Sequence, residues 1–200
     1  MKKVIFLLAL CNSFTLFAAS DAQNGQEKSV ICAACHGPKG ISINPSWPNL
    51  AGQHATYLIK QLQNFKEKKG RDDPTMAPMV ASLSEQDIAD LAAFYAALPP
   101  PEGSPAKQVS TRGEQLYRSG DMDQHITACI ACHGPKGTGN AQAGFPLLSG
   151  QQSDYTVLQL KAFKAGKRSN DLNSIMRDIC GRMSTDDMEA VANYIAGLRS

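Results

Sequence analysis

The chain has 200 residues, of which 42% are hydrophobic and 19% charged, and its formal net charge is +2. This length predicts one domain or two small ones and excludes a large multidomain enzyme and a polytopic membrane protein. Ordinary apolar content with a low net charge excludes a disordered chain, and there is no basic excess that would indicate nucleic-acid binding. Six cysteines need an explanation, and disulfides, a metal or haem are the candidates.

The first predicted element in chain order is a signal peptide at residues 1–22. Lys2 and Lys3 precede a short apolar run, and small residues follow it, which is the layout of a secretory signal. The small-residue rule allows cleavage after Ser20 or after Ala22. A membrane anchor is the alternative, but the run is short for about 30 Å of hydrocarbon, so no transmembrane span is expected in the mature chain. The signal predicts export to the periplasm.

The rest of the chain repeats itself. CAACHGPKG at residues 32–40 recurs as CIACHGPKG at 129–137, and LAGQ at 50–53 recurs as LSGQ at 148–151. Such self-similarity predicts two homologous domains. The proline-rich stretch between them cannot continue a helix and is typical of a semi-rigid linker. We therefore predict a first domain at 23–98, a linker at 99–106 and a second domain at 107–200.

Both domains are predicted to be helical. Apolar residues recur at helical spacing behind Ser84 and again behind Ser184, and each serine can serve as an N-cap. Amphipathic helices are expected at about 54–69 and 153–165, and a short helix is expected to carry each cysteine pair. Because no alternating strand pattern is present, the predicted fold class is all-α.

A CxxCH sequence occurs once in each repeat and is the attachment signature of c-type haem. On one helical turn, two thiols three residues apart can bond the two vinyl groups of one porphyrin, and the following histidine can bind the iron. Zinc sites and thioredoxin-like redox pairs also use CxxC, but neither explains a histidine that follows both copies. The prediction is two covalently bound haem c, attached at Cys32 and Cys35 with His36 as iron ligand, and at Cys129 and Cys132 with His133 as iron ligand.

The sixth iron ligand is sought at matched positions of the two repeats. Met76 lies eight residues before Ser84 and Met176 lies eight before Ser184, whereas Met79 has an isoleucine as its counterpart. Met76 and Met176 are therefore the predicted ligands, expected in irregular segments ahead of the last helix of each domain. Core packing is the alternative for both, and Met79 is the competitor in the first half. A thioether ligand raises the reduction potential, and two protein ligands close the coordination sphere, so outer-sphere electron transfer is the expected chemistry.

These residues resemble tandem class I cytochromes c, and most closely the dihaem cytochrome c4 family, over nearly the whole mature chain. The resemblance extends to Pro48 and Pro146, one after each haem motif, and implies that each proline carbonyl accepts the Nδ1–H of the proximal histidine. It implies two domains related by a pseudo-twofold. It also implies an electron carrier, not an enzyme, that passes electrons from a quinol-oxidising cytochrome bc complex to a terminal oxidase.

Two other functions stay open. Dihaem subunits of flavoprotein dehydrogenase complexes look similar, and the length of the chain does not separate them from a free carrier. A dihaem peroxidase would usually need a longer chain and an iron with an available position. Redox protein partners are expected for the carrier and for the subunit, and peripheral membrane association is left open.

Two further features have simple interpretations. Cys180 is a thiol left over after haem attachment, and a buried small residue is the default for it.

A cluster of basic residues follows each amphipathic helix. A solvated helix end is the simpler interpretation, and attraction of an acidic redox partner is the alternative. The clusters are Lys66, Lys68, Lys69 and Arg71 in the first half, and Lys161, Lys164, Lys167 and Arg168 in the second.

Overall fold

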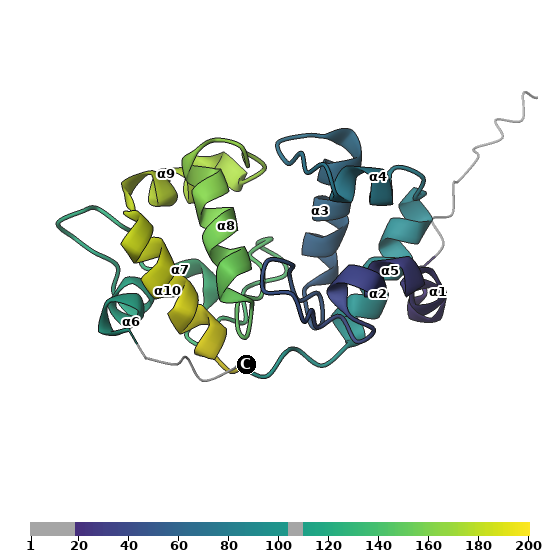
Figure 1. Cartoon of the computed structure of the whole chain (residues 1–200), viewed down its shortest axis with the longest axis horizontal. Coiled ribbons are helices and arrows are strands. Elements are labelled where there is room, and N and C mark those ends of the chain that lie inside the picture. The colour runs from purple at the N-terminus through teal and green to yellow at the C-terminus, as the bar shows by residue number, and fades with distance from the viewer. Residues whose placement is uncertain (1–18, 104–109) are drawn as a thin grey trace, which may run out of the picture.

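The computed structural model describes residues 19–103 and 110–200 (Figure 1). Residues 1–18 of the predicted signal peptide and 104–106 of the predicted linker lie outside the described residues. Within the described ranges the chain forms helices and three isolated β-bridges, without a strand. The predicted all-α class is therefore confirmed.

The first domain contains five helices: α1 (Ala22–Lys28), α2 (Val30–His36), α3 (Ala55–Glu67), α4 (Met76–Val80) and α5 (Glu85–Ala97). Ser84 caps α5 as predicted, because its hydroxyl accepts from the Asp87 N–H while the Asp87 carboxylate accepts from the Ser84 N–H. α3 is the expected amphipathic helix and buries Leu58 and Phe65. α1 packs closely on α5 at Gly25, which is buried.

The second domain repeats this order: α6 (Thr111–Arg118), α7 (Ile130–His133), α8 (Ser153–Lys164), a 3-10 turn (Leu172–Ser174), α9 (Ile175–Arg182) and α10 (Thr185–Gly197). Ser184 and Asp187 form the same capping box at the start of α10. α10 packs against α6 and α8 around a core that includes Cys180, which is fully buried as expected. No helix in the described part of the chain is long and apolar enough to cross a membrane.

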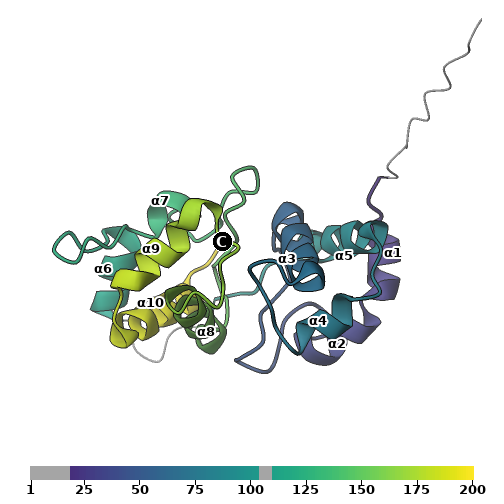
Figure 2. The same ribbon diagram turned by 90° about the horizontal axis from the view of Figure 1, so that it is seen from above.

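The two domains lie side by side. Figures 1 and 2 both show α3 of the first domain and α8 of the second facing the centre of the molecule, with the other helices outside them. The chain leaves α5 along the lower edge of Figure 1 and continues toward the second domain. Helices α1, α2, α3 and α5 match α6, α7, α8 and α10 in order and role, so the molecule has the predicted pseudo-twofold arrangement with a proline-containing connection at 99–103.

Candidate functional site

A cavity of about 1100 Å³ extends through both domains and is lined by residues of each. It exceeds the roughly 300–1,000 Å³ of an ordinary ligand pocket, which suits more than one large ligand. Leucine, phenylalanine and methionine side chains make much of its wall. The structure brings every predicted site residue to this cavity: Cys32, Cys35, His36, Pro48, Met76, Cys129, Cys132, His133, Pro146 and Met176.

In the first domain, helix α2 carries the cysteine pair and ends on its histidine. Cys32 and Cys35 lie one turn apart, and His36 is the last helical residue. Gly37 then takes a φ of 78°, which turns the chain away where most residues would be strained. His36 is only 6% exposed, and its Nδ1 lies 2.9 Å from the Pro48 carbonyl oxygen. Since a carbonyl can only accept, Nδ1 carries the proton and Nε2 keeps its lone pair.

The second domain repeats this geometry around α7. His133 is 7% exposed, its Nδ1 lies 3.0 Å from the Pro146 carbonyl oxygen, and Gly134 ends the helix with a φ of 75°. Burial lowers the pKa of His133 and of His36, and the bond to the proline carbonyl offsets this only in part. Each ring is therefore a neutral imidazole with one fixed tautomer, the state that binds a metal ion.

The four motif cysteines line the cavity, are partly buried and form no disulfide with one another. Burial raises the pKa of Cys32, and it raises the pKa of Cys129 to about 11. No group of three or more His, Cys, Asp or Glu side chains in residues 19–103 and 110–200 is placed to hold a metal ion together. The alternative of a four-ligand zinc site therefore gains no support from the geometry.

The predicted methionine ligands lie in helices, so the expectation of irregular segments was wrong. Met76 begins α4, where the Asp73 carboxylate accepts from the Met76 N–H and starts the helical turn. Met176 lies in α9, whose first turn is held by the Asp171 carboxylate accepting from the Arg177 N–H. Both methionines are half-buried and line the cavity.

Met79, the competitor in the first half, also lines the cavity and is 37% exposed. Presence in the cavity wall therefore does not show whether Met79 or Met76 is the iron ligand. In the second half Met176 packs against the buried core of its domain. The choice in the first half still rests on the matched spacing of Met76 and Met176 in the repeat.

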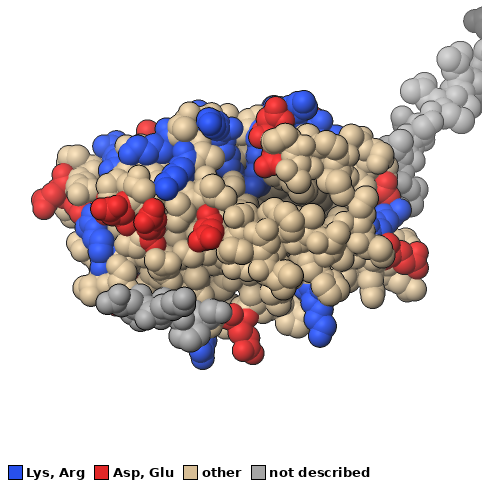
Figure 3. Space-filling model, in the orientation of Figure 1, with Lys and Arg blue, Asp and Glu red and all other residues tan. Residues whose placement is uncertain are grey.

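Two arginines of the basic clusters are buried, which corrects the interpretation of those clusters as solvated helix ends. Arg71 and Arg168 are 8% and 7% exposed, and an isolated antiparallel bridge joins their backbones across the two domains. The lysines of both clusters are exposed, and Figure 3 shows blue side chains along the upper edge, where α3 and α8 end. The expectation fits the lysines and fails for the arginines, because a side chain from the other domain covers each guanidinium.

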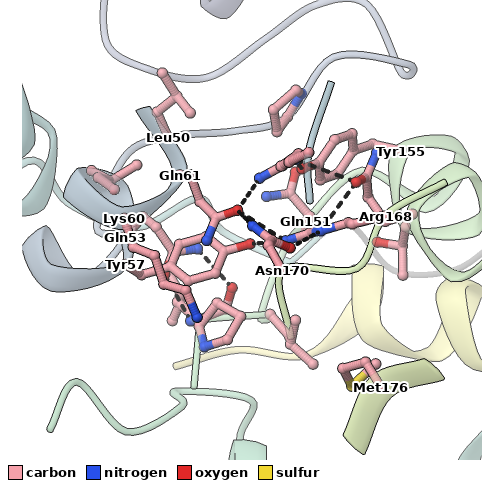
Figure 4. Close-up of a pocket in the computed structure, with 18 of the residues that line it drawn as sticks. Leu50, Gln53, Tyr57, Lys60, Gln61, Gln151, Tyr155, Arg168, Asn170 and Met176 are labelled. Carbon is pink, nitrogen blue, oxygen red and sulfur yellow. Dashed lines mark hydrogen bonds between the residues drawn. The ribbon is translucent and has the colours of Figure 1, made fainter. Parts of the chain in front are cut away.

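The arginines bind the opposite domain in a nearly symmetric way. Arg71 donates to the Tyr155 hydroxyl at 2.8 Å, and Arg168 donates to the Tyr57 hydroxyl at 2.9 Å. Each also donates to the side-chain oxygen of Gln61 in the first domain and Gln159 in the second, and Figure 4 shows part of this network at the cavity. Sequence reasoning missed this network, although its tyrosines and glutamines recur in both repeats and that recurrence was the available signal.

Neither guanidinium of this network has a carboxylate partner among the described residues. A buried cation is costly without an anion. Burial raises the pKa of Tyr57, but Arg168 and Arg71 outweigh it and bring that pKa below the ordinary value of a phenol. The centre of the molecule is therefore electropositive and lies beside an apolar cavity with paired thiols and neutral imidazoles. Those features fit haem c, an apolar macrocycle with two vinyl groups, one iron and two carboxylates.

Comparison with known proteins agrees with this fit. The family described as Cytochrome c matches residues 22–98 and again 110–199. A cytochrome c4 of Azotobacter vinelandii is 43% identical over 98% of this chain and 97% of its own length, and a "Thiosulfate dehydrogenase electron acceptor" of Stutzerimonas stutzeri is 34% identical over 99% and 97%. The crystal structure of reduced recombinant cytochrome c4 from Pseudomonas stutzeri, 43% identical, superimposes with a TM-score of 0.87 over 90% of this chain and all of that one. The chain therefore belongs to the cytochrome c family, among the dihaem cytochromes c4, and is an electron carrier with two covalently bound haem c rather than an enzyme.

Proposed function

We propose that this protein works in the periplasm and passes single electrons from a quinol-oxidising cytochrome bc complex to a terminal oxidase. The observation that carries the proposal is the paired geometry of His36 and His133. Each is buried and neutral, and a proline carbonyl holds its Nδ1–H so that Nε2 is left for iron. Two such sites in one cavity favour a carrier with two redox centres.

We assign the ligands of each haem as follows. The thiols of one motif would attach each porphyrin, and the following histidine and one methionine would bind its iron. When bound, haem supplies a one-electron iron couple, and a thioether ligand raises its potential. In the first domain the residues are Cys32, Cys35, His36 and Met76, with Pro48 behind the histidine; in the second they are Cys129, Cys132, His133 and Met176, with Pro146 behind the histidine.

The chain's own residues perform the remaining tasks. Two protein ligands would leave each iron no open position, which favours outer-sphere transfer over peroxide chemistry. The cavity shared by the domains keeps both centres inside one protein, so an electron that enters at one centre can leave at the other. Arg71 and Arg168, which are buried at the cavity, would supply positive charge to balance the haem carboxylates.

The assignment of the methionines is tested by substitution. We expect wild-type protein to contain two covalent haems per chain by pyridine haemochrome and to show the methionine–iron band of the oxidised state. Met76→Ala and Met176→Ala should each remove half of that band. Met79→Ala is the matched control and should keep all of it. Loss of the band in the Met79 variant, with retention in the Met76 variant, would reverse the assignment.

The transfer function is tested by reconstitution. The bc complex should reduce the protein when it is supplied with quinol, and membranes that contain the terminal oxidase should oxidise it. If the protein exchanges electrons with neither the bc complex nor the oxidase, its proposed position between these two complexes is refuted. Intact-mass measurement of protein from the periplasmic fraction tests export, since processing would remove the predicted signal.

A second candidate function is to accept electrons from a dehydrogenase. The protein would do so either as the separate electron acceptor of that enzyme or as the dihaem subunit of a flavoprotein complex. The observation that favours it is the similarity to a thiosulfate dehydrogenase electron acceptor along nearly the full length of both chains. Reduction by a purified thiosulfate dehydrogenase at a rate above that with the bc complex would support this candidate. Copurification with a flavoprotein would support the subunit form of it.

A further inference from the structure

Two glutamines of the repeated sequence LAGQ/LSGQ lie buried between the domains, and the proposed function gives them no role. Gln53 is 5% exposed and Gln151 is 8% exposed. Each directly precedes the N-cap residue of a central helix, α3 or α8. Both are labelled at the cavity in Figure 4.

Gln53, from the first domain, binds both main-chain polar groups of Leu147 in the second domain. Its Oε1 accepts from the Leu147 N–H at 2.9 Å, and its Nε2 donates to the Leu147 carbonyl at 3.0 Å. The Leu147 nitrogen belongs to the same peptide group as the Pro146 carbonyl, which lies 3.0 Å from Nδ1 of His133. The peptide is planar, so holding its N–H also fixes the direction of its carbonyl.

Gln151, from the second domain, makes the mirror contact. Its Oε1 accepts from the Asn49 N–H at 2.8 Å, and its Nε2 donates to the Asn49 carbonyl at 3.0 Å. That N–H shares a peptide group with the Pro48 carbonyl, which lies 2.9 Å from Nδ1 of His36. A chain of hydrogen bonds thus runs from the glutamine of one domain to the proximal histidine of the other in both directions.

We infer that Gln53 and Gln151 are positioning residues, each of which orients and tunes the proximal histidine of the opposite domain. The inference rests on the proposed role of His36 and His133 as iron ligands. Bonds in such a chain polarise one another, so a peptide N–H that donates to glutamine makes its carbonyl a better acceptor. A better acceptor for Nδ1–H makes the imidazole a stronger donor to iron, which favours the oxidised state.

The inference predicts a crossed effect that interface packing alone would not produce. Gln53→Leu keeps a side chain of similar size but removes both amide bonds to Leu147. The potential of the haem in the second domain should then rise while that of the first stays unchanged. Gln151→Leu should raise the potential of the haem in the first domain alone. Gln63→Leu is the control, since Gln63 lies on α3 and donates to Glu85 at the exposed surface.

The experiment uses the full-length protein with both haems. Spectroelectrochemical titration gives the two potentials, and the hyperfine-shifted haem methyl resonances of the oxidised protein report the orientation of each histidine ring. Nuclear Overhauser contacts to side chains of each pocket assign the resonances to a domain. Amide hydrogen exchange provides a second readout, and the Leu147 amide should exchange about tenfold faster in Gln53→Leu while the Asn49 amide stays protected.

The outcomes are distinct. Shifts confined to the opposite haem support the inference. Shifts in the same domain, equal shifts at both haems, or unchanged potentials and resonances overturn it. If Gln53→Leu does not mature, Gln53→Met and the reciprocal Gln151→Leu each carry the same test. Wild-type protein that lacked two haems with histidine and methionine ligation would overturn the ligand assignment instead, so the two failures can be told apart.

Discussion

Gly25 offers a sharp test of how the first domain is held together. This residue lies in α1 where the helix crosses α5. A Cβ atom placed on Gly25 would lie 2.0 Å from the Asp90 carbonyl oxygen and 2.9 Å from Phe94 Cβ. Ordinary contact begins at 3.4 Å, and the nearest obstacle is backbone, which cannot rotate away. Gly25→Ala must therefore push the two helices apart.

The magnitude follows from two opposing effects. Overpacking of a tight contact costs about 1–3 kcal/mol, and a backbone clash as close as that at Gly25 belongs at the upper end. Alanine gains about 1 kcal/mol over glycine as a helix former. The expected net loss is about 2 kcal/mol, which lowers the melting temperature of a domain of this size by about 8 °C or more. α1 has seven residues and is too short to persist after it leaves α5.

The assay is thermal and urea unfolding followed by far-UV circular dichroism. Gly113→Ala tests the matching contact between α6 and α10, where a Cβ atom would lie 2.1 Å from the Ala190 carbonyl oxygen. Gly181→Ala is the control, since it lies in α9 with nothing within 4 Å of its Cβ position, and it should be neutral or stabilising by up to about 1 kcal/mol. If Gly25→Ala is as stable as Gly181→Ala, the reasoning from close helix packing is refuted.

Four further predictions concern charge, helix capping and processing. Burial alone would raise the pKa of Asp187, but bonds from an arginine and from Ser184 hold it below its ordinary value. Stability of the second domain should therefore be complete above about pH 4 and fall as the pH drops further; Ser184→Ala should cost about 1 kcal/mol in urea unfolding. Arg71→Gln should lower both haem potentials, because it removes a buried positive charge beside the cavity, whereas the exposed Arg118→Gln should leave them unchanged in redox titration. Asp21 caps α1, so the mature protein should retain it, and an intact mass that begins after Ala22 would contradict that reasoning.

Much of the candidate site could be predicted because its chemistry is local in sequence. Cys32, Cys35 and His36 fall on one helical turn, and their spacing alone determines that thiols and imidazole face the same side. The repeat doubled this signal and supplied the pairing of Met76 with Met176. The helices that follow Ser84 and Ser184 could be predicted equally well, because the N-cap and the helical spacing of apolar residues lie within one short segment.

The remaining features depend on contacts between segments about 100 residues apart. Arg71 and Arg168 stand next to exposed lysines, and nothing along one helix distinguishes a covered guanidinium from a solvated one. Burial of each comes from a tyrosine of the other domain, Tyr155 or Tyr57.

The helical form of the methionine segments was also missed, for a local reason. Single carboxylates such as that of Asp73 start these helices, and the helices have no long run of apolar residues at helical spacing.

The reciprocal contacts between the domains have a consequence for the origin of the molecule. Gln53 binds the second domain as Gln151 binds the first, and the two arginines exchange partners in the same way. A self-complementary pattern in which each surface contacts its own copy is the mark of an isologous dimer interface. The chain thus has the organisation of a symmetric homodimer whose two subunits were fused. Fusion frees each copy to change independently, so one ancestral redox site can become an entry and an exit with different potentials.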